Sequence, residues 1–323
     1  MKFDLRQFAR FAACSLALCA AATATAQSYP AKPVRILLGF AAGGSIDIVT
    51  RVVAHGLSGS TGQTFVVENR PGAGGNIAVD ALLKAPRDGY TILMGATGIA
   101  ANPALYKKVP YQMDDLVAIS LVGEAPMLFM ATPSLPANSV QELIRLAKAK
   151  PGTIRSAMVT GTTSHLASDM FRMMAGVDIP LVPYKVNGQA FQDVMSGQVE
   201  MVVLTIPESL SHVRAKRVKA IAQTGRKRSS LAPEIPTLDE AGLKGYAISA
   251  WYLALGPSGM PQEIVTRLNQ EIEKVLKQPE VQARLKASGV DIVGGTAQQA
   301  ADFLKSEHEK LSKLVRWSGA KVE

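Results

Sequence analysis

The chain has 323 residues, of which 47% are hydrophobic and 6% aromatic, and its formal net charge is +9. This length is enough to bury two hydrophobic cores of ordinary size. The low aromatic content argues against a base-stacking platform, so we predict no nucleic-acid partner. The positive charge favours contact with anionic small molecules or a membrane surface.

The first 26 residues have the pattern of a cleavable secretory signal peptide. Three basic residues precede an apolar run at 11–22, and the small residues of 24–26 lie directly before Gln27. We therefore predict cleavage before Gln27 and a free protein in the periplasm. Both cysteines, Cys14 and Cys19, lie in the segment predicted to be removed, so the mature chain has no disulfide and no cysteine ligand.

The segment at 34–47 predicts a strand, a tight turn and the start of a helix. A β-branched, apolar run ends in FAAGGSID, and apolar residues at helical spacing follow it. Gly43 and Gly44 permit the sharp turn, and Ser45 is the predicted N-cap. The unpaired N–H groups of such a helix start attract anions. The alternative is that the glycine pair only connects the strand to the helix.

Strands and helices alternate along the rest of the chain. Further strands are predicted at 65–68, 91–95, 128–131, 155–159, 181–184, 201–204, 220–223 and 248–255. Ser139 and Pro151 mark the two ends of one helix, and three C-terminal helices are predicted at 262–277, 280–287 and 298–317. This alternation predicts an α/β fold with mainly parallel sheets and helices on both faces.

Two more small-residue loops follow predicted strands, at 96–103 and at 160–165. Open α/β sheets bind ligands at the carboxyl ends of their strands, so both loops are candidate binding loops. The glycines at 72–74 resemble part of a dinucleotide fingerprint, but Ile77 replaces its third glycine, and we predict a plain strand-to-helix turn. A basic cluster is interpreted as a solvated surface; it comprises Arg214, Lys216, Arg217, Lys219, Arg226, Lys227 and Arg228.

The sequence contains no recognisable catalytic or metal-binding motif. There is no G-x-S-x-G elbow, no H-E-x-x-H pair and no phosphate-binding P-loop. The four histidines are far apart in the sequence, with no ligand spacing among them. Ser164 and His165 are adjacent at a helix start, which points their side chains in different directions, so we reject a catalytic dyad. We predict no catalytic residue, no metal and no cofactor.

Several motifs together resemble a known family. They are YPAKPVRILLGFAAGGSID, VVENRPGAGGNIA, DGYTIL, NPALYKKVPY, GTTSHLASDMF, VPYK, GQVE, PTLDEAGLKGY and VGGTAQQAADF. In this order they resemble the Bug (Bordetella uptake gene) family, the periplasmic solute-binding proteins of tripartite tricarboxylate transporters. The resemblance implies a two-domain periplasmic-binding-protein type II fold that closes on a small carboxylate and has no catalytic activity.

The resemblance also implies a ligand site formed by both domains. On the first domain the matching positions are Phe40, Ala41, Gly43, Gly44, Asp47, Thr97, Gly98 and Asn102. The opposing domain offers Gly161, Thr162, Thr163, Ser164, His165, Tyr184 and Lys185. Two positions depart from the family pattern: Val186 stands where glycine is common, and Leu204 where an acidic residue is frequent. The second departure favours an organic or aromatic carboxylate over an amino acid.

We expect domain 1 to contain residues 27–127 and 256–323, and domain 2 to contain residues 128–255, including the crossing strands.

The leading function is capture of a small carboxylate and its delivery, by a monomer, to the membrane subunits of the transporter. Two alternatives remain at this point. One is a ligand sensor that docks to a signalling receptor, and the other is a two-domain transferase that acts on an anionic substrate.

Overall fold

The structure is a computed structural model that describes residues 29–322. The chain divides into two units, Met1–Ala31 and Lys32–Glu323, and the fold below is that of the second unit. The predicted signal peptide at 1–26 lies outside the described residues. None of the helices in the described part combines the length and the apolar character of a membrane-crossing segment.

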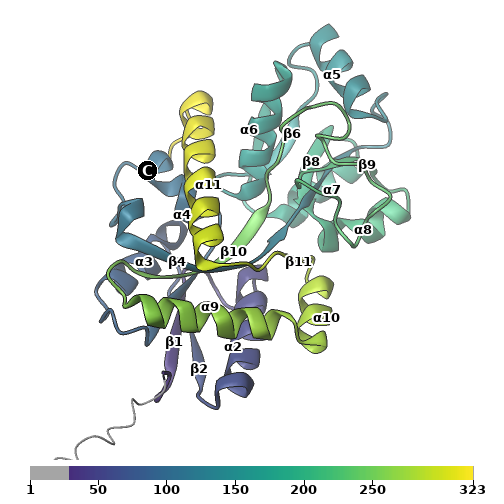
Figure 1. The fold of residues 1–323 in the computed structure, drawn as a ribbon. Coiled ribbons are helices and arrows are strands. Elements are labelled where there is room, and N and C mark those ends of the chain that lie inside the picture. Colours follow the sequence, from purple (N-terminus) through teal and green to yellow (C-terminus); the bar gives the residue numbers. More distant parts are fainter. Residues whose placement is uncertain (1–28, 323) are drawn as a thin grey trace, which may run out of the picture. The chain divides into compact units, whose positions relative to one another are not determined.

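Eleven strands of the described chain form two sheets (Figure 1). The strands are β1 (Val34–Leu38), β2 (Phe65–Asn69), β3 (Thr91–Gly95), β4 (Leu116–Ala125), β5 (Met127–Ala131), β6 (Ser156–Val159), β7 (Leu181–Tyr184), β8 (Met201–Thr205), β9 (Lys219–Gln223), β10 (Ala250–Pro257) and β11 (Asp291–Ile292). The first sheet has the order β11-β4-β10-β3-β1-β2, and the second has the order β7-β6-β8-β5-β9.

Helices flank both sheets. They are α2 (Ser45–Thr61), α3 (Asn76–Leu83), α4 (Gly98–Leu105), α5 (Val140–Ala149), α6 (Thr163–Ala175), α7 (Asn187–Met195), α8 (Ile206–Arg214), α9 (Gln262–Leu276), α10 (Pro279–Ala287) and α11 (Ala297–Ser318), with 3-10 turns η2 (Ala73–Gly75) and η3 (Met113–Asp115). Strand β4 packs against both α9 and α11, and most of its residues are buried.

The predicted α/β fold class is confirmed, but the sheets are mixed rather than mainly parallel. β1 runs parallel to β2 and β3, and β6 runs parallel to β7 and β8. β10 is antiparallel to β3 and β4, β11 to β4, and β5 to β8 and β9. The reversed directions come from the two chain crossings: β4 ends at Ala125 and β5 begins at Met127 in the other sheet, and β10 returns to the first sheet.

The two sheets share one large apolar cluster. It includes Leu93 and Leu121 of the first sheet, Phe129 and Met201 of the second, and Trp251 of the returning strand β10. We expected residues 248–255 to belong with the middle of the chain, and the structure pairs β10 with β3 and β4 instead. The division into two domains stays a prediction, because sheet membership alone does not define a boundary.

Helix α4 occupies part of the segment that we interpreted as a loop. The prolyl nitrogen of Pro103 cannot donate to the carbonyl of Ile99, the usual partner four residues earlier. That carbonyl accepts a hydrogen bond from the Tyr111 hydroxyl at 2.8 Å instead. A tertiary contact thus replaces the missing helical hydrogen bond, which explains how the helix forms in a Gly- and Pro-containing segment.

Two glycines of α2 offer a test of the packing between α2 and α9. At Gly56 an added Cβ would lie 2.5 Å from Cγ1 of the buried Val275, whereas at the exposed Gly59 it would meet nothing within 4 Å. We expect Gly56→Ala to lower the free energy of unfolding by about 1–3 kcal/mol through overpacking. Gly59→Ala should raise it by about 0.5–1 kcal/mol through helix propensity. Urea unfolding of both variants checks this, and equal stabilisation by both would contradict the packing.

Candidate ligand-binding site

The loop between β1 and α2 is held in place by a buried carboxylate. Asp47 is only 3% exposed, and its Oδ2 accepts hydrogen bonds from the Gly43 N–H at 3.0 Å and from Arg51 Nε at 2.9 Å. Its Oδ1 accepts from Asn69 Nδ2 at 2.9 Å. Asn69 Nδ2 also lies 3.0 Å from the Phe40 carbonyl oxygen, so the end of β2 and the β1–α2 loop form one hydrogen-bonded unit.

The donors around Asp47 decide its ionisation. The hydrogen bond from Arg51 lowers the pKa of the Asp47 carboxyl most, and the Gly43 N–H and Asn69 lower it further. Burial acts in the opposite direction, and the net result is a pKa of about 2. Both oxygens accept hydrogen bonds from protein donors, so the carboxylate fixes the conformation of the loop from its buried side.

The outer side of this loop presents backbone N–H groups. Residues 41–45 are exposed, and the N–H groups of Ala41, Ala42 and Ser45 form no hydrogen bond in the part of the chain that the structure describes. The prediction of Ser45 as the N-cap is wrong. Gly44 is the N-cap, with φ −75° and ψ 166°, and the Ser45 hydroxyl lies 2.6 Å from the Tyr252 hydroxyl.

Gly43 has φ +86°, in the left-handed region that glycine adopts without strain. This conformation brings its N–H to the Asp47 carboxylate and leaves the neighbouring amides free. The loop therefore combines free donors with the positive end of the α2 dipole, an arrangement suited to an anion.

Two more loops of the first sheet approach the β1–α2 loop. A Cβ at Gly39 would lie 2.5 Å from the Gly75 Cα, so the backbones after β1 and β2 touch. Asn102 of α4 is buried and donates to the Gly74 carbonyl at 3.0 Å and to Asn76 Oδ1 at 2.8 Å. The three loops after β1, β2 and β3 thus converge at one edge of the sheet.

Sequence reasoning placed Thr97, Gly98 and Asn102 in the site. Thr97 and Asn102 are buried, and Thr97 Oγ1 lies 3.4 Å from the Ser249 carbonyl oxygen. A Cβ at Gly98 would lie 3.2 Å from the Gly74 carbonyl oxygen. The protein contacts of these residues show them to be supports of the loops, and their contact with a ligand stays a prediction.

Asn69 and the turn at 72–76 are parts of this site that we did not predict from the sequence. The turn was interpreted as a plain connection, although its glycines follow a predicted strand as those of the first loop do. That shared position at the carboxyl end of a strand was the available signal.

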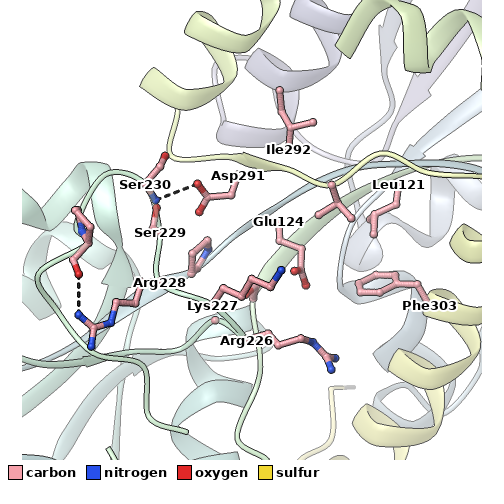
Figure 2. A pocket seen from close by; sticks show the side chains of 15 residues that line it. Leu121, Glu124, Arg226, Lys227, Arg228, Ser229, Ser230, Asp291, Ile292 and Phe303 are labelled. Carbon is pink, nitrogen blue, oxygen red and sulfur yellow. Dashed lines mark hydrogen bonds between the residues drawn. The ribbon is translucent and has the colours of Figure 1, made fainter. Parts of the chain in front are cut away.

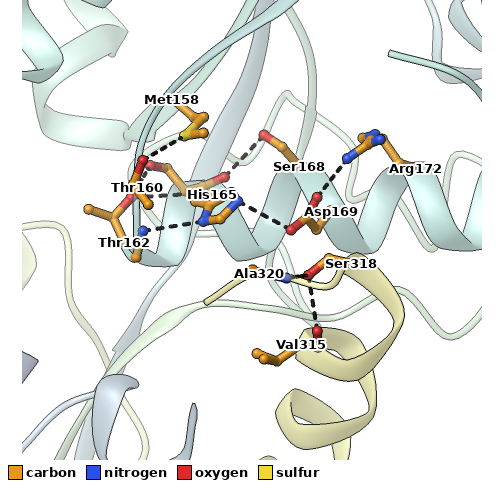
Figure 3. A network of polar contacts seen from close by, with 12 residues as sticks. Met158, Thr160, Thr162, His165, Ser168, Asp169, Arg172, Val315, Ser318 and Ala320 are labelled. Carbon is orange, nitrogen blue, oxygen red and sulfur yellow. Dashed lines mark hydrogen bonds and ion pairs between the residues drawn. The ribbon is translucent and has the colours of Figure 1, made fainter. Parts of the chain in front are cut away.

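The second sheet carries the other predicted loop, between β6 and α6 (Figure 3). Thr162 is the N-cap of α6, and its hydroxyl accepts a hydrogen bond from the His165 N–H at 3.4 Å and donates to the Val159 carbonyl at 2.7 Å. The hydroxyls of Thr162 and Ser164 lie 2.8 Å apart. Ser164 therefore pairs with Thr162 rather than with His165, in agreement with our rejection of a catalytic dyad.

His165 is buried and its two ring nitrogens have different partners. The Gly161 N–H donates to Nδ1 at 3.2 Å, so the ring proton resides on Nε2, which lies 3.3 Å from Asp169 Oδ2. Burial, the largest effect, lowers the pKa of His165. Asp169 also pairs with Arg172 at 2.9 Å, which balances its charge (Figure 3). A neutral His165 thus fixes the turn at Gly161.

Tyr184 and Lys185 lie next to this loop at the end of β7. Tyr184 pairs with Val159 in the sheet register, and its hydroxyl donates to Asp193 Oδ2 at 2.6 Å, the main cause of the raised pKa of Tyr184. Lys185 is exposed and forms no hydrogen bond or ion pair within residues 29–322.

The structure therefore gathers the predicted site residues into two groups. One group lies at the edge of the first sheet and the other at the edge of the second, and within the described residues no hydrogen bond or ion pair joins them. Their use as one site stays a prediction. In the same part of the chain no group of three His, Cys, Asp or Glu side chains is placed to hold a metal ion.

The role of Asp47 can be tested through its pH dependence. The pKa of its carboxyl in the folded protein is about 2, below the value of about 3.9 in unfolded chains. Its contribution is therefore fully present above about pH 4 and is lost as the pH falls toward 2. We expect Asp47→Asn to lower the free energy of unfolding by about 2 kcal/mol at pH 7 and by almost nothing near pH 2. Urea unfolding across this range is the measurement; an equal difference at both pH values would contradict the argument.

Several known proteins resemble this chain over most of its length. Residues 49–319 match the family TctC, described as the tripartite tricarboxylate transporter family receptor. Protein BugT of Bordetella pertussis (strain Tohama I) is 34% identical over 307 residues, which cover 94% of each chain. R. palustris Rpa4515, solved with adipate, has 33% identity and a TM-score of 0.74 over 90% of this chain and 98% of its own. The periplasmic binding protein BugD has 31% identity and a TM-score of 0.72 over 91% and 100%.

These similarities include both mixed sheets and their flanking helices, and they confirm the resemblance drawn from the sequence motifs. They also resolve the enzyme alternative, because the matched family consists of binding proteins and not of enzymes. The chain belongs to the TctC family of tripartite tricarboxylate transporter receptors, the periplasmic solute-binding proteins of the Bug type.

Proposed function

We propose that this protein captures a small organic carboxylate in the periplasm and delivers it to the membrane subunits of a tripartite tricarboxylate transporter. The observation that carries the proposal is the exposed β1–α2 loop, with free N–H groups at the start of a 17-residue helix and a buried carboxylate beneath it. The relative Rpa4515, which was solved with adipate, supports a dicarboxylate as one ligand class.

In the proposed complex, backbone amides rather than an arginine hold the first carboxylate. The free N–H groups of Ala41, Ala42 and Ser45 and the α2 dipole supply the attraction. The start of α6 supplies a second set of donors, since the N–H groups of Thr163 and Ser164 form no hydrogen bond within the described residues. Amide donors and bridging waters avoid the cost of desolvating a buried fixed cation.

The remaining predicted residues have supporting or distal roles in this proposal. Asp47, Asn102 and His165 position the loops, because their side chains are occupied by protein partners. Tyr184 and Lys185 meet the far end of the ligand. An aliphatic or aromatic dicarboxylate long enough to reach from α2 to Lys185 fits this arrangement.

We further propose that the protein acts as an exported monomer after removal of residues 1–26. In this proposal one domain contains residues 27–127 and 256–323 and the other contains residues 128–255. The pairing of β10 with β3 and β4 favours moving the second boundary to a point before β10. The ligand sensor is the remaining alternative, and loss of carboxylate uptake in cells that lack this protein would favour transport.

Gly44→Val tests the amide site. The backbone of Gly44 is extended, which any residue adopts, and a Cβ there would have only the Ala41 carbonyl oxygen within 4 Å, at 3.7 Å. The fold therefore accommodates a side chain, but the space in front of the free amides does not remain open for a carboxylate. We expect calorimetry with adipate to show at least a hundredfold loss of affinity.

Gly59→Val in the same helix is the matched control, because Gly59 is exposed and has open space around it. Its adipate affinity should equal that of the wild type, and thermal unfolding should show both variants to be folded. Undiminished adipate affinity in a folded Gly44→Val would place the carboxylate elsewhere.

Lys185→Ala tests the contact with the distal end of the ligand. The exposed ammonium group has no partner among residues 29–322, so its removal should affect only ligands that carry a second carboxylate. We expect calorimetry to show a three- to tenfold loss of affinity for adipate and no change for hexanoate, which has the same chain length and one carboxylate. An equal loss for both ligands would assign Lys185 to the first carboxylate or to the fold.

A further inference from the structure

A cavity of about 580 Å³ lies between the end of β4 and the segment after β9 (Figure 2). Its walls come from β4, β11 and α11 on one side and from the segment after β9 on the other. None of the fifteen predicted site residues lines it. Its volume is within the range of about 300–1,000 Å³ that is usual for small-molecule sites.

In the described part of the chain, three charged side chains of this cavity make no direct polar contact, although Glu124 lies within electrostatic range of Lys310 and Arg226. Glu124, Arg226 and Lys227 form no hydrogen bond and no ion pair within the described residues. Burial, the largest effect, raises the pKa of the Glu124 carboxyl. Glu124 is half-buried and lines the cavity, so a hydrogen-bond donor of a ligand can approach its carboxyl group.

The other charged groups of the cavity are already engaged. Arg228 pairs with Glu240 at 2.7 Å and donates to the Pro233 carbonyl at 2.9 Å. Asp291 Oδ1 accepts from the Ser230 N–H at 3.2 Å, which links β11 to the loop after β9 (Figure 2). The free groups of the cavity are therefore one acid and two bases.

The position of Glu124 in the sheet places it beside an apolar wall. In the antiparallel register Glu124 lies opposite Trp251, and opposed residues share one face of a sheet. Trp251 packs edge-on against Phe303 of α11, with ring centroids 5.8 Å apart. Phe303 and Leu121 line the cavity next to Glu124 (Figure 2), so the acid and an aromatic wall are side by side.

The base of the cavity is tightly packed where the two chain crossings meet. A Cβ at Gly225 would lie 2.9 Å from the Pro126 Cβ. This contact sets Arg226 and Lys227, which follow Gly225, close to the β4–β5 connection. The acid thus comes from the end of β4, and the two bases come from the segment after β9.

We propose that this cavity is a second binding site, for a small zwitterion that carries an ammonium group and a carboxylate on an apolar body. The ammonium group meets Glu124, the carboxylate meets Arg226 and Lys227, and the apolar body lies on Phe303 and Leu121. Such a ligand satisfies both signs of charge at once, which a simple carboxylate or a simple amine does not. A ligand in this cavity contacts elements of both sheets.

L-Phenylalanine is a suitable probe, with two analogues that each lack one charged group. We expect calorimetry on the purified protein to show binding of L-phenylalanine, and at least tenfold weaker binding of 2-phenylethylamine, which lacks the carboxylate. 3-Phenylpropionate lacks the ammonium group. It is measured in Gly44→Val so that the carboxylate site does not contribute. It should bind this variant at least tenfold more weakly than L-phenylalanine does. Equal binding of the three compounds in this variant, or no binding of L-phenylalanine, would overturn the proposal.

Substitutions in the cavity test whether L-phenylalanine binds there. Glu124→Gln and Arg226→Met should each weaken L-phenylalanine binding at least tenfold and leave adipate binding unchanged. Arg217→Met removes an exposed cation of the same basic cluster outside the cavity, and it should change neither. L-Phenylalanine affinity that survives in both cavity variants, or that is lost in Gly44→Val, would overturn the assignment. Loss of adipate binding in Gly44→Val with retained L-phenylalanine binding separates this site from the proposed function.

Discussion

The hydrogen bonds to Asp47 are the constraint on which the β1–α2 loop depends. A negative charge close to the proposed anion site would normally repel a ligand. Here Arg51 pairs with the Asp47 carboxylate and balances its charge, and the Gly43 N–H and Asn69 also donate to it. The N–H groups on the outer side then remain free because their neighbours are fixed. Under the proposed function, the loop is arranged before a ligand arrives, which reduces the entropic cost of binding.

The return of the chain from the second sheet to β10 of the first sheet depends on α11. The buried Glu307 accepts a hydrogen bond from Trp251 Nε1 at 3.2 Å and pairs with Lys310 of the same helix. Lys310 also donates to the Ala247 carbonyl at 2.9 Å. One buried ion pair thus holds the chain on both sides of the start of β10. Because removal of one partner would leave an uncompensated buried charge, this contact specifies where the chain re-enters the first sheet.

Local patterns in the sequence were sufficient for most strands and helices. Among the elements that were missed, which include α8 and β11, β4 and α4 were missed for different reasons. Strand β4 is apolar on nearly every residue, so it shows no alternation that separates it from a buried helix. Helix α4 contains Pro103, and its formation depends on Tyr111, which supplies the missing hydrogen bond from outside the helix. The periodicity of a segment contains no information about such distant partners.

The sequence by itself determined the family, the glycine-rich turns at strand ends and the apolar faces of the helices, because these depend on motifs and on neighbours within a few residues. Only the tertiary structure decided the strand directions and the partners of the site residues. Asp47 meets Asn69 across 22 residues, and Ser45 meets Tyr252 across 207. Contacts over such separations form only when the whole fold brings the segments together, so the ionisation of Asp47 and the free amides beside it follow from the fold and not from the loop sequence alone.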